Sequence, residues 1–383
     1  MNQQKKIANR IFSIVFVCLI FGLALVNILG PKHTFSENEN RSLQQKPEFC
    51  VDDFFSGDYT SDYESYVSDQ FWNRDFWIKL KVKVERKFGK QEVNQVYFAK
   101  DNYLIEKHTP LDVNTELIEK NTHRIQNFVQ IYGDHIDGNI SVMIVPTASE
   151  ILKDKMPKYA PNIDEESLIQ QVSEDVIGEN VKVIDLVPSL QKHSDEYIYY
   201  RTDHHWTTLG AWYSYQTWQK ELGGTLIDES DVTKETVSTD FYGTTYSKVN
   251  IPLESDSIDI YHSKWENQCK IIVDEKEEQS SLYDFEFLKT KDQYAMFLSG
   301  NHAIVNIETG QKTGKILLVI KDSYANCFVP FLVGQYDNII MLDYRYFTKS
   351  TKEIMESNEI TDVLILYNAV NFAQDQYLGK LLK

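Results

Sequence analysis

An acidic side chain and two imidazoles occupy consecutive positions at Asp203, His204 and His205. Side chains alternate between the two sides of an extended segment, so Asp203 and His205 point the same way and His204 points the other way. A carboxylate beside an imidazole fixes the tautomer of the ring and supports its protonated form. The pair therefore suits a general base that takes a proton from a hydroxyl or thiol nucleophile elsewhere in the chain.

Ser323 is a hydroxyl in a suitable local setting. It follows the apolar run 315–320 and precedes residues 324–333, which we expect to be helical. At such a strand-to-helix turn the hydroxyl is exposed, and unpaired backbone N–H groups lie near it. Ser323 is thus the predicted nucleophile. The alternative is that Asp322 or Ser323 only caps the helix.

Candidate donors for a developing oxyanion follow another apolar run near the end of the sequence. Asn368 and Asn371 come directly after residues 362–367, and Tyr324 lies next to Ser323. Side-chain amides and backbone N–H groups are the usual donors to such an oxyanion. We expect Asn368 to be the first candidate donor, Asn371 the second and Tyr324 a further one.

A metal ion is another ligand that one acid and two imidazoles could take. Such a site needs further ligands from elsewhere in the chain. The seven histidines other than His204 and His205 show no paired His-x-x-x-His spacing, and no Cys-x-x-Cys pair is present. We therefore predict no metal and no cofactor. A role for the triplet in capping the helix that follows stays open.

Five short apolar runs predict the architecture. Runs of this kind are typical of strands that are buried on both faces of a parallel sheet. Helical patterns between them favour an α/β fold with a flavodoxin-like, doubly wound and mostly parallel five-stranded sheet. Ligands bind such sheets outside the carboxyl ends of the strands, where we expect the Asp-His pair, Ser323 and Asn368 to meet. The predicted strands are residues 140–146, 181–186, 315–320, 338–343 and 362–367.

Other segments surround this sheet. A hairpin is expected from residues 95–98 and 103–105, and an irregular insertion with antiparallel strands from about 223 to 310. Residues 51–89 carry aromatic and aliphatic side chains at helical spacing, which fits one or two amphipathic helices broken near Asn73. Such a stripe is more often core than a sugar-binding platform, so we expect it to be buried. Further helices are predicted at 114–132, 165–177, 211–222, 324–333 and 352–357.

The N-terminus predicts a membrane anchor. Residues 11–30 contain no charged side chain, and a helix of that length, at about 1.5 Å per residue, spans the core of a bilayer, about 30 Å. Lys5, Lys6 and Arg10 precede the apolar run. We therefore expect residues 1–10 in the cytoplasm and the bulk of the chain outside the cell membrane, held by a single span.

The part beyond the anchor is predicted to comprise a polar linker over residues 31–50 and one domain over 51–383. A cleaved signal peptide is the alternative to an anchor, although Val26-Asn27-Ile28 is a poor cleavage site. The net charge of −18 argues against non-specific binding to nucleic acid or to an anionic lipid surface. The four scattered cysteines form no disulfide framework.

Several stretches together resemble a known family. The sequence Asp-His-His-Trp at residues 203–206 and the sequence Lys-Asp-Ser-Tyr-Ala-Asn at 321–326 are its specific parts, and residues 39–43 and 69–75 match as well. The chain resembles the SGNH-type acyl hydrolases and transferases in a circularly permuted motif order. It is similar to the alginate O-acetyltransferase group and, above all, to the DHHW proteins of bacteria. That family is named after the sequence Asp-His-His-Trp, which this chain contains literally.

The resemblance implies a membrane-anchored O-acyltransferase that moves an acetyl group to a cell-surface polysaccharide. Ser323 would be the nucleophile, His205 the base and Asp203 the residue that orients it. A multi-pass membrane O-acyltransferase would be the acetyl donor, and no nucleic acid partner is expected. Candidate substrate contacts are Arg201, His204, Trp206 and Arg345.

Two alternatives share the same sequence features. With water as acceptor, the same site would be an SGNH-type carbohydrate esterase. Lys321 stands where the resemblance has a glycine, and together with the acidic composition it motivates a catalytically inactive surface scaffold or glycan-binding protein.

Overall fold

The computed structural model describes residues 3–36 and 41–383. The chain divides into two compact units, residues 1–90 with 249–251 and residues 91–248 with 252–383. The predicted domain of residues 51–383 therefore spans both units. Three predictions fall partly outside the described residues: the start of the cytoplasmic tail at 1–2, residues 37–40 of the linker, and Glu39 and Asn40 of the family match.

The N-terminal unit begins with helix α1 (Gln3–Leu29). Among the described residues, α1 is the one helix that is long and apolar enough to cross a membrane, over Lys5–Leu29. A helix of this kind near the N-terminus fits a membrane anchor or a signal sequence. After it, the short strands β1 (Phe35–Ser36) and β2 (Arg41–Ser42) pair antiparallel.

The aromatic stretch of this unit forms three helices, α2 (Val51–Ser56), α3 (Asp58–Asp69) and α4 (Arg74–Lys87). The predicted break near Asn73 is confirmed, because Asn73 adopts a left-handed backbone with φ of 52°, a region that asparagine tolerates. The prediction of a buried aromatic stripe is wrong. Most of its large side chains, among them Phe55, Trp72 and Phe76, are exposed to solvent.

The second unit is built on an eight-stranded sheet with the order β11-β10-β12-β14-β13-β15-β6-β7. The strands from β14 to β7 are parallel neighbours, so the five predicted parallel strands are confirmed. Three antiparallel strands from the predicted insertion extend the sheet beyond the expected five. The strands are β6 (Ile140–Val145), β7 (Val181–Val183), β10 (Lys270–Val273), β11 (Glu277–Gln279), β12 (Ile304–Glu308), β13 (Ile316–Lys321), β14 (Asn338–Leu342) and β15 (Asp362–Asn368).

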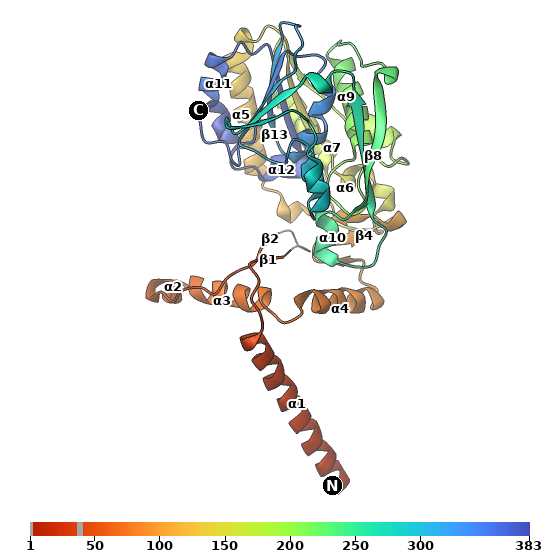
Figure 1. Cartoon of the computed structure of the whole chain (residues 1–383), viewed down its shortest axis with the longest axis vertical. Helices are drawn as coiled ribbons and strands as arrows, with labels where there is room; N and C mark the ends of the chain where they lie inside the picture. Colours follow the sequence, from red (N-terminus) through yellow and green to blue (C-terminus); the bar gives the residue numbers. More distant parts are fainter. Residues whose placement is uncertain (1–2, 37–40) are drawn as a thin grey trace. The chain divides into compact units, whose positions relative to one another are not determined.

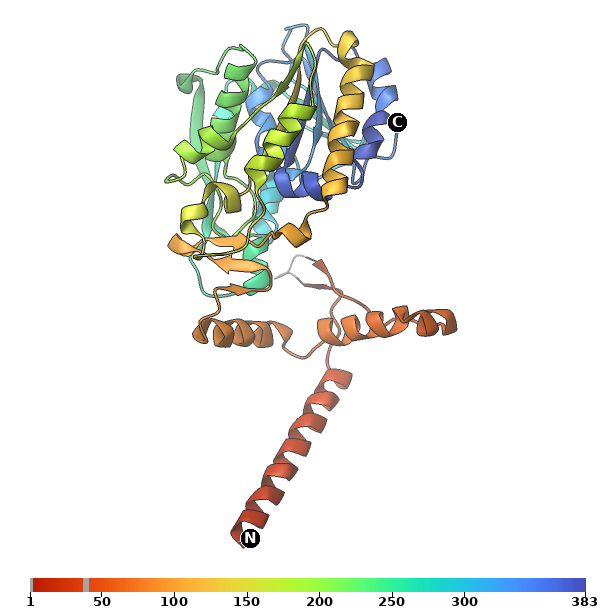
Figure 2. The same cartoon turned by 180° about the vertical axis from the view of Figure 1, so that it is seen from behind.

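Helices lie on both faces of this sheet, with α5 and α9 on opposite sides (Figures 1 and 2). On one face, α5, α7 and α12 pack against one another. On the other, the indole of Trp218 in α9 donates to Ser141 of β6 at 3.0 Å. The α-helices of the unit are α5 (Thr115–Tyr132), α6 (Ala148–Ile151), α7 (Glu165–Asp175), α8 (Val187–Lys192), α9 (Thr208–Glu221), α10 (Thr244–Val249), α11 (Thr351–Ser357) and α12 (Ala369–Gln374).

The segment after β13 differs from the helix predicted over residues 324–333. It forms two short 3₁₀-helices, η9 (Ser323–Cys327) and η10 (Val329–Leu332). Pro330 lies at the start of η10 and has no backbone N–H to continue an α-helical ladder. The chain therefore turns tightly after β13 instead of running on as one helix.

The remaining strands form two small antiparallel sheets. The predicted hairpin is confirmed as β4 (Val96–Phe98) and β5 (Leu104–Glu106), with β3 (Glu92–Val93) beside β4. Within the insertion, β8 (Val232–Phe241) pairs with β9 (Asp256–Ser263). This pair does not join the large sheet.

Candidate active site

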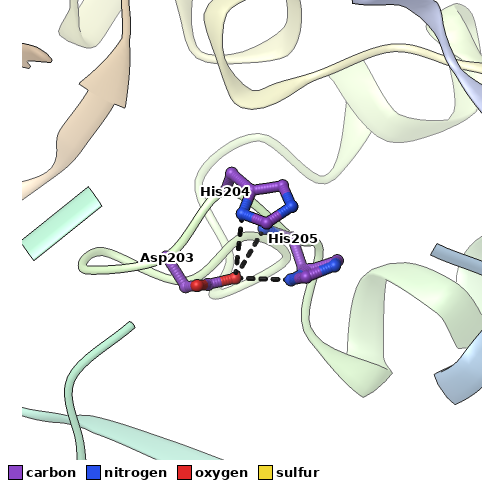
Figure 3. A group of neighbouring side chains, drawn as sticks. All are labelled: Asp203, His204 and His205. Atoms are coloured by element: carbon purple, nitrogen blue, oxygen red, sulfur yellow. Dashed lines mark hydrogen bonds and ion pairs between the residues drawn. The ribbon is translucent and has the colours of Figure 1, made fainter. Parts of the chain in front are cut away.

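Three predicted residues meet in one hydrogen-bonded line. The Oγ atom of Ser323 lies 2.8 Å from Nε2 of His205, and Nδ1 of His205 lies 2.6 Å from Oδ1 of Asp203. Figure 3 shows Asp203 with both imidazoles around its carboxylate. All three side chains of the line are buried. Residues more than a hundred positions apart in the sequence thus meet in the geometry that a nucleophile, a base and an orienting carboxylate require.

The sheet register positions Ser323. Lys321 at the end of β13 pairs with Leu366 of β15, so the turn after β13 lies beside the end of β15. The next residue, Asp322, caps η9 by accepting the Tyr324 N–H at 2.9 Å. Ser323 is the first residue of η9, so its own N–H has no acceptor within that helix.

The insertion holds Asp203 in place. Its Oδ2 atom accepts the backbone N–H of Thr244 at 2.8 Å and the Thr244 hydroxyl at 3.0 Å. Gly243 is needed for this approach, because a Cβ atom there would lie 2.2 Å from the side chain of Asp203. The sequence predicts a role for neither residue. A Gly-Thr pair in an irregular segment carries no signal of its own.

The buried setting decides the charge states of the Asp-His pair. Burial opposes ionisation of Asp203, but the charges of His204 and His205 and the hydrogen bonds from His205 and Thr244 outweigh it and hold the pKa of Asp203 well below its usual value. Burial, with a contribution from His204, lowers the pKa of His205 to about 4 despite the opposing Asp203 charge. His205 is therefore a neutral ring at pH 7, able to accept a proton through Nε2.

Tyr294 completes the surroundings of His205, and the sequence predicts no role for it either. Its ring stacks on the His205 ring with a centroid distance of 3.8 Å and an interplanar angle of 11°. Its hydroxyl donates to the carbonyl oxygen of Ser323 at 3.1 Å. Tyr294 lies in η8 (Gln293–Met296), inside the predicted insertion. One tyrosine from the insertion thus contacts both His205 and the backbone of Ser323.

The predicted oxyanion donors surround the carboxylate of Asp322. The side-chain amides of Asn368 and Asn371 donate to its Oδ2 atom at 2.9 and 2.8 Å. Each amide nitrogen carries a second hydrogen, and both residues line the cleft beside the triad. Tyr324 differs, since its N–H bonds to Asp322 and its hydroxyl to the carbonyl oxygen of His204. Both of its donors are engaged away from Ser323.

Lys321, which stands in place of a glycine, is buried next to the site. Its Nζ atom donates to Asn326 at 2.7 Å and to Asn301 at 3.0 Å, and it lies 3.8 Å from a carboxylate oxygen of Asp343. Burial lowers the pKa of Lys321 to about 8, partly offset by the charge of Asp343. The lysine thus has its own polar partners and leaves the Ser-His hydrogen bond intact.

The four predicted substrate contacts have different surroundings. His204 lines the cleft, and its Nδ1 atom lies 2.7 Å from the Thr244 hydroxyl. The guanidinium of Arg201 lies over the rings of Tyr103 and Tyr197. Arg345 is bound by Asp343 through two nitrogens. Trp206 is fully buried and donates to the carbonyl oxygen of Tyr324 at 3.1 Å, so it offers no surface to a substrate.

The cleft beside the triad is lined from several elements. Asn368 faces it from the end of β15, Asn371 from α12 and His204 from the loop before α9. Glu106 and His108 come from the segment at the end of β5. Thr147 and Ser149 line it as well, from the N-cap and the first turn of α6. Both of these hydroxyls bond the buried carboxylate of Glu165. The cleft thus offers hydroxyl, amide, imidazole and carboxylate groups next to the apolar side chains of Leu104, Ile105, Ala148 and Val370.

The same triplet has the geometry to hold a metal ion, since ligand atoms of Asp203, His204 and His205 lie within 4.8 Å of one another. Several of these atoms are engaged in hydrogen bonds. The Nε2 atom of His205 bonds Ser323, and both oxygens of Asp203 accept bonds from His205 or Thr244. A metal ion in this place would displace the hydrogen bonds that align the triad.

Comparisons with known proteins agree with this fold. The chain is similar to the structure of a DHHW family protein from Eubacterium siraeum, with 24% identity and a TM-score of 0.61, over 76% of this chain and 97% of that chain. It is also similar to PatB1 of Bacillus cereus with a sulfonyl adduct, with 21% identity and a TM-score of 0.64, over 76% of this chain and 100% of that one. At these identities the likeness is one of fold.

Curated proteins give no match to the chain. A family described as DHHW protein matches residues 115–342. The match covers more than half of the 383 residues and contains both the Asp-His-His-Trp sequence and Ser323. The chain therefore belongs to the DHHW family.

Proposed function

We propose that this DHHW protein is a membrane-anchored, extracytoplasmic O-acyltransferase that transfers an acetyl group to a cell-surface polysaccharide. The observation that supports it best is the line from Ser323 Oγ through the His205 ring to Asp203, with distances of 2.8 and 2.6 Å. In this proposal α1 is the anchor, and the order of the motifs is a circular permutation of the SGNH order. A multi-pass membrane acyltransferase supplies the acetyl group.

The reaction has two halves that use the same residues. In the first, Ser323 Oγ attacks the acetyl carbonyl of the donor while His205 Nε2 takes the hydroxyl proton. His205 then gives this proton to the leaving group, and an acetyl-serine ester remains. In the second half, His205 takes a proton from a sugar hydroxyl, whose oxygen attacks the ester. The ester bond to Ser323 breaks, and the proton returns to Ser323 Oγ.

Hydrogen-bond donors for the oxyanion of the tetrahedral intermediate come from the ends of β13 and β15, next to Ser323. The backbone N–H of Ser323 lies at the first position of η9. The side-chain amides of Asn368 and Asn371 line the cleft, and each has a second hydrogen besides the one that it donates to Asp322. Such pre-positioned donors stabilise charge as it develops on the carbonyl oxygen. We assign the oxyanion to these three groups and leave Tyr324 out.

The test is covalent labelling of the full chain with methanesulfonyl fluoride, because PatB1, which shares the fold, is known with a sulfonyl adduct. Mass spectrometry should find one sulfonyl group on Ser323. Labelling should be lost in Ser323→Ala and kept in Ser214→Ala, which removes a buried hydroxyl that bonds Gly210 within its own helix. A folded chain that stays unlabelled would favour an inactive scaffold or glycan-binding protein.

A transferase and an esterase differ only in the hydroxyl that reaches the acetyl-serine. The cleft places the hydroxyl, carboxylate and imidazole groups of Thr147, Ser149, Glu106 and His108 beside apolar side chains, and this mixed lining supports a sugar, with its hydroxyl groups and C–H faces, as the acceptor. Incubation with an activated acetyl ester and an oligosaccharide should therefore yield acetylated sugar. Release of acetate alone, at a rate that the sugar does not change, would identify an esterase.

A further inference from the structure

Helix α4 carries an apolar stripe that faces solvent. Phe76, Leu80, Val84 and Phe88 recur every four residues, and their side chains are 50%, 39%, 43% and 85% exposed. Residues at this spacing lie on one face of a helix. Val82 points away from that face and is fully buried. The helix thus already has a core-facing side, and the exposed stripe is a second apolar surface.

The polar residues around the stripe are basic. Residues 74–90 contain seven lysines and arginines against two acidic residues, Asp75 and Glu85, in a chain whose net charge is −18. A helix with Trp, Phe and Leu on one face and Lys and Arg around it is typical of helices that lie in the interface of a bilayer. The charge of the whole chain hides this local excess.

The structure fixes the start of α4 at the end of the candidate membrane helix. The backbone N–H of Trp72 donates to the side-chain oxygen of Asn27 at 2.6 Å, and Asn27 lies two residues before the end of α1. Gln70 adds two bonds to the backbone of His33, at 2.9 and 2.8 Å. If α1 spans the bilayer, Trp72 lies at the level of the headgroups, where tryptophan is enriched.

Within this unit, α3 and α4 run across the end of α1 (Figures 1 and 2). A helix that crosses the end of a spanning helix lies along the membrane surface. We infer that α4 lies in the outer interface of the membrane, with the stripe of Phe76, Leu80, Val84 and Phe88 in the acyl boundary and its lysines at lipid phosphates. This inference rests on α1 as the anchor of the proposed function, but not on the chemistry of Ser323.

Tryptophan fluorescence of the full chain in phospholipid nanodiscs tests the inference. Of the six tryptophans, Trp72 and Trp77 adjoin the stripe, whereas Trp206, Trp212 and Trp218 are buried in the other unit and Trp265 is half-buried there. Lipids brominated near the headgroup end of the acyl chain should quench the emission more than lipids brominated near its methyl end. The quenching should disappear when Trp72 and Trp77 are both replaced by Tyr, and it should remain in Trp265→Tyr.

A second variant keeps the fluorescent residues Trp72 and Trp77 and removes the apolar stripe. Phe76→Ser with Leu80→Ser and Phe88→Ser should reduce the bromolipid quenching at least about twofold, since the stripe no longer holds Trp77 in the interface. Phe285→Ser with Leu226→Ser removes exposed apolar side chains from the other unit and should change nothing. Adding phosphatidylglycerol to phosphatidylcholine discs should increase quenching of the unchanged chain, because α4 is basic.

Three results would overturn the inference. The first is equal emission in brominated and plain lipids, and the second is unchanged quenching after removal of the stripe. The third is two copies of the chain per disc with unquenched tryptophans, which would assign the stripe to a contact between copies. Sulfonyl labelling of Ser323, measured on the same samples, tells whether the proposed function stands independently of this result.

Discussion

The ring of Tyr294 lies nearly parallel on the ring of His205, 3.8 Å away and at an angle of 11°. The stack covers one face of the imidazole, while Asp203 holds its Nδ1 atom at 2.6 Å. His205 is thus fixed in both position and rotation. The proposed function needs the Nε2 atom of His205 directed at Ser323, so the stack has a testable part in the proposed reaction.

Tyr294→Ala removes the stack and leaves a cavity, so we expect acetyl transfer to fall about 10- to 100-fold through misplacement of the base and the free energy of unfolding to fall by about 3–5 kcal/mol. Tyr294→Phe keeps the ring and loses the contacts of its hydroxyl with the Ser323 carbonyl and the Cys327 sulfur, so transfer should stay within a few-fold of the unchanged chain. Acetate release and urea denaturation measure the two effects. An alanine variant with full activity would contradict a positioning role.

Asp203→Asn tests the carboxylate. The substitution keeps the shape but turns one acceptor into a donor, so the tautomer of His205 with its proton on Nε2 is favoured, and this tautomer cannot accept from Ser323. By analogy with serine hydrolases, the turnover number should fall by about 10⁴-fold with little change in substrate binding. Single-turnover kinetics with an activated acetyl ester check the prediction. Thr244→Val, which removes only one of the bonds to Asp203, should cost far less.

The acidic limit of activity should follow the pKa of His205, which burial and His204 lower to about 4. The neutral base is the active form, so the rate should stay level from about pH 7 to about pH 5 and fall as the pH drops through about 4. His204→Gln removes one cause of the lowering and should move this limb to higher pH. A pH profile of Ser323 sulfonylation measures both, and a limb that does not move would exclude a contribution of His204.

A metal chelator separates the two uses of the triplet at Asp203, His204 and His205. If the triplet serves Ser323, dipicolinate should leave sulfonylation and acetyl transfer unchanged, and added zinc should inhibit by displacing the aligned hydrogen bonds. Loss of activity in chelator, with recovery on zinc addition, would show instead that the site works with a metal ion.

The strands and the positions of Ser323 and the Asp-His pair could be predicted because they depend on local patterns. An unbroken apolar run indicates a buried strand wherever it occurs, and the end of such a strand indicates the edge of the sheet. The Asp-x-His spacing likewise needs no distant information. The strand ends and the Asp-x-His spacing together predict that Ser323 and His205 meet, and the structure has a hydrogen bond between them.

The contributions of the insertion could not be predicted. Thr244 and Tyr294 act through contacts with residues far away in the sequence, and neither stands in a periodic pattern. The prediction that the aromatic stretch is core fails because periodicity indicates an apolar face but not what covers it. Phe76 and Leu80 are an example, because a core helix and a helix in a membrane interface have the same spacing of apolar residues.

Asp322 is the residue whose loss should disturb the site most without touching the triad. It is buried, and it accepts the N–H of Tyr324, the N–H and amide of Asn368, and the amide of Asn371. Asp322→Ala leaves these donors without an acceptor, so we expect the chain to lose about 3–5 kcal/mol of unfolding free energy. Ser323 sulfonylation should slow as well, because the turn after β13 loosens. Asp228→Ala, at an exposed helix cap, should have only a small effect in the same urea denaturation, and equal losses in the two variants would refute the assignment.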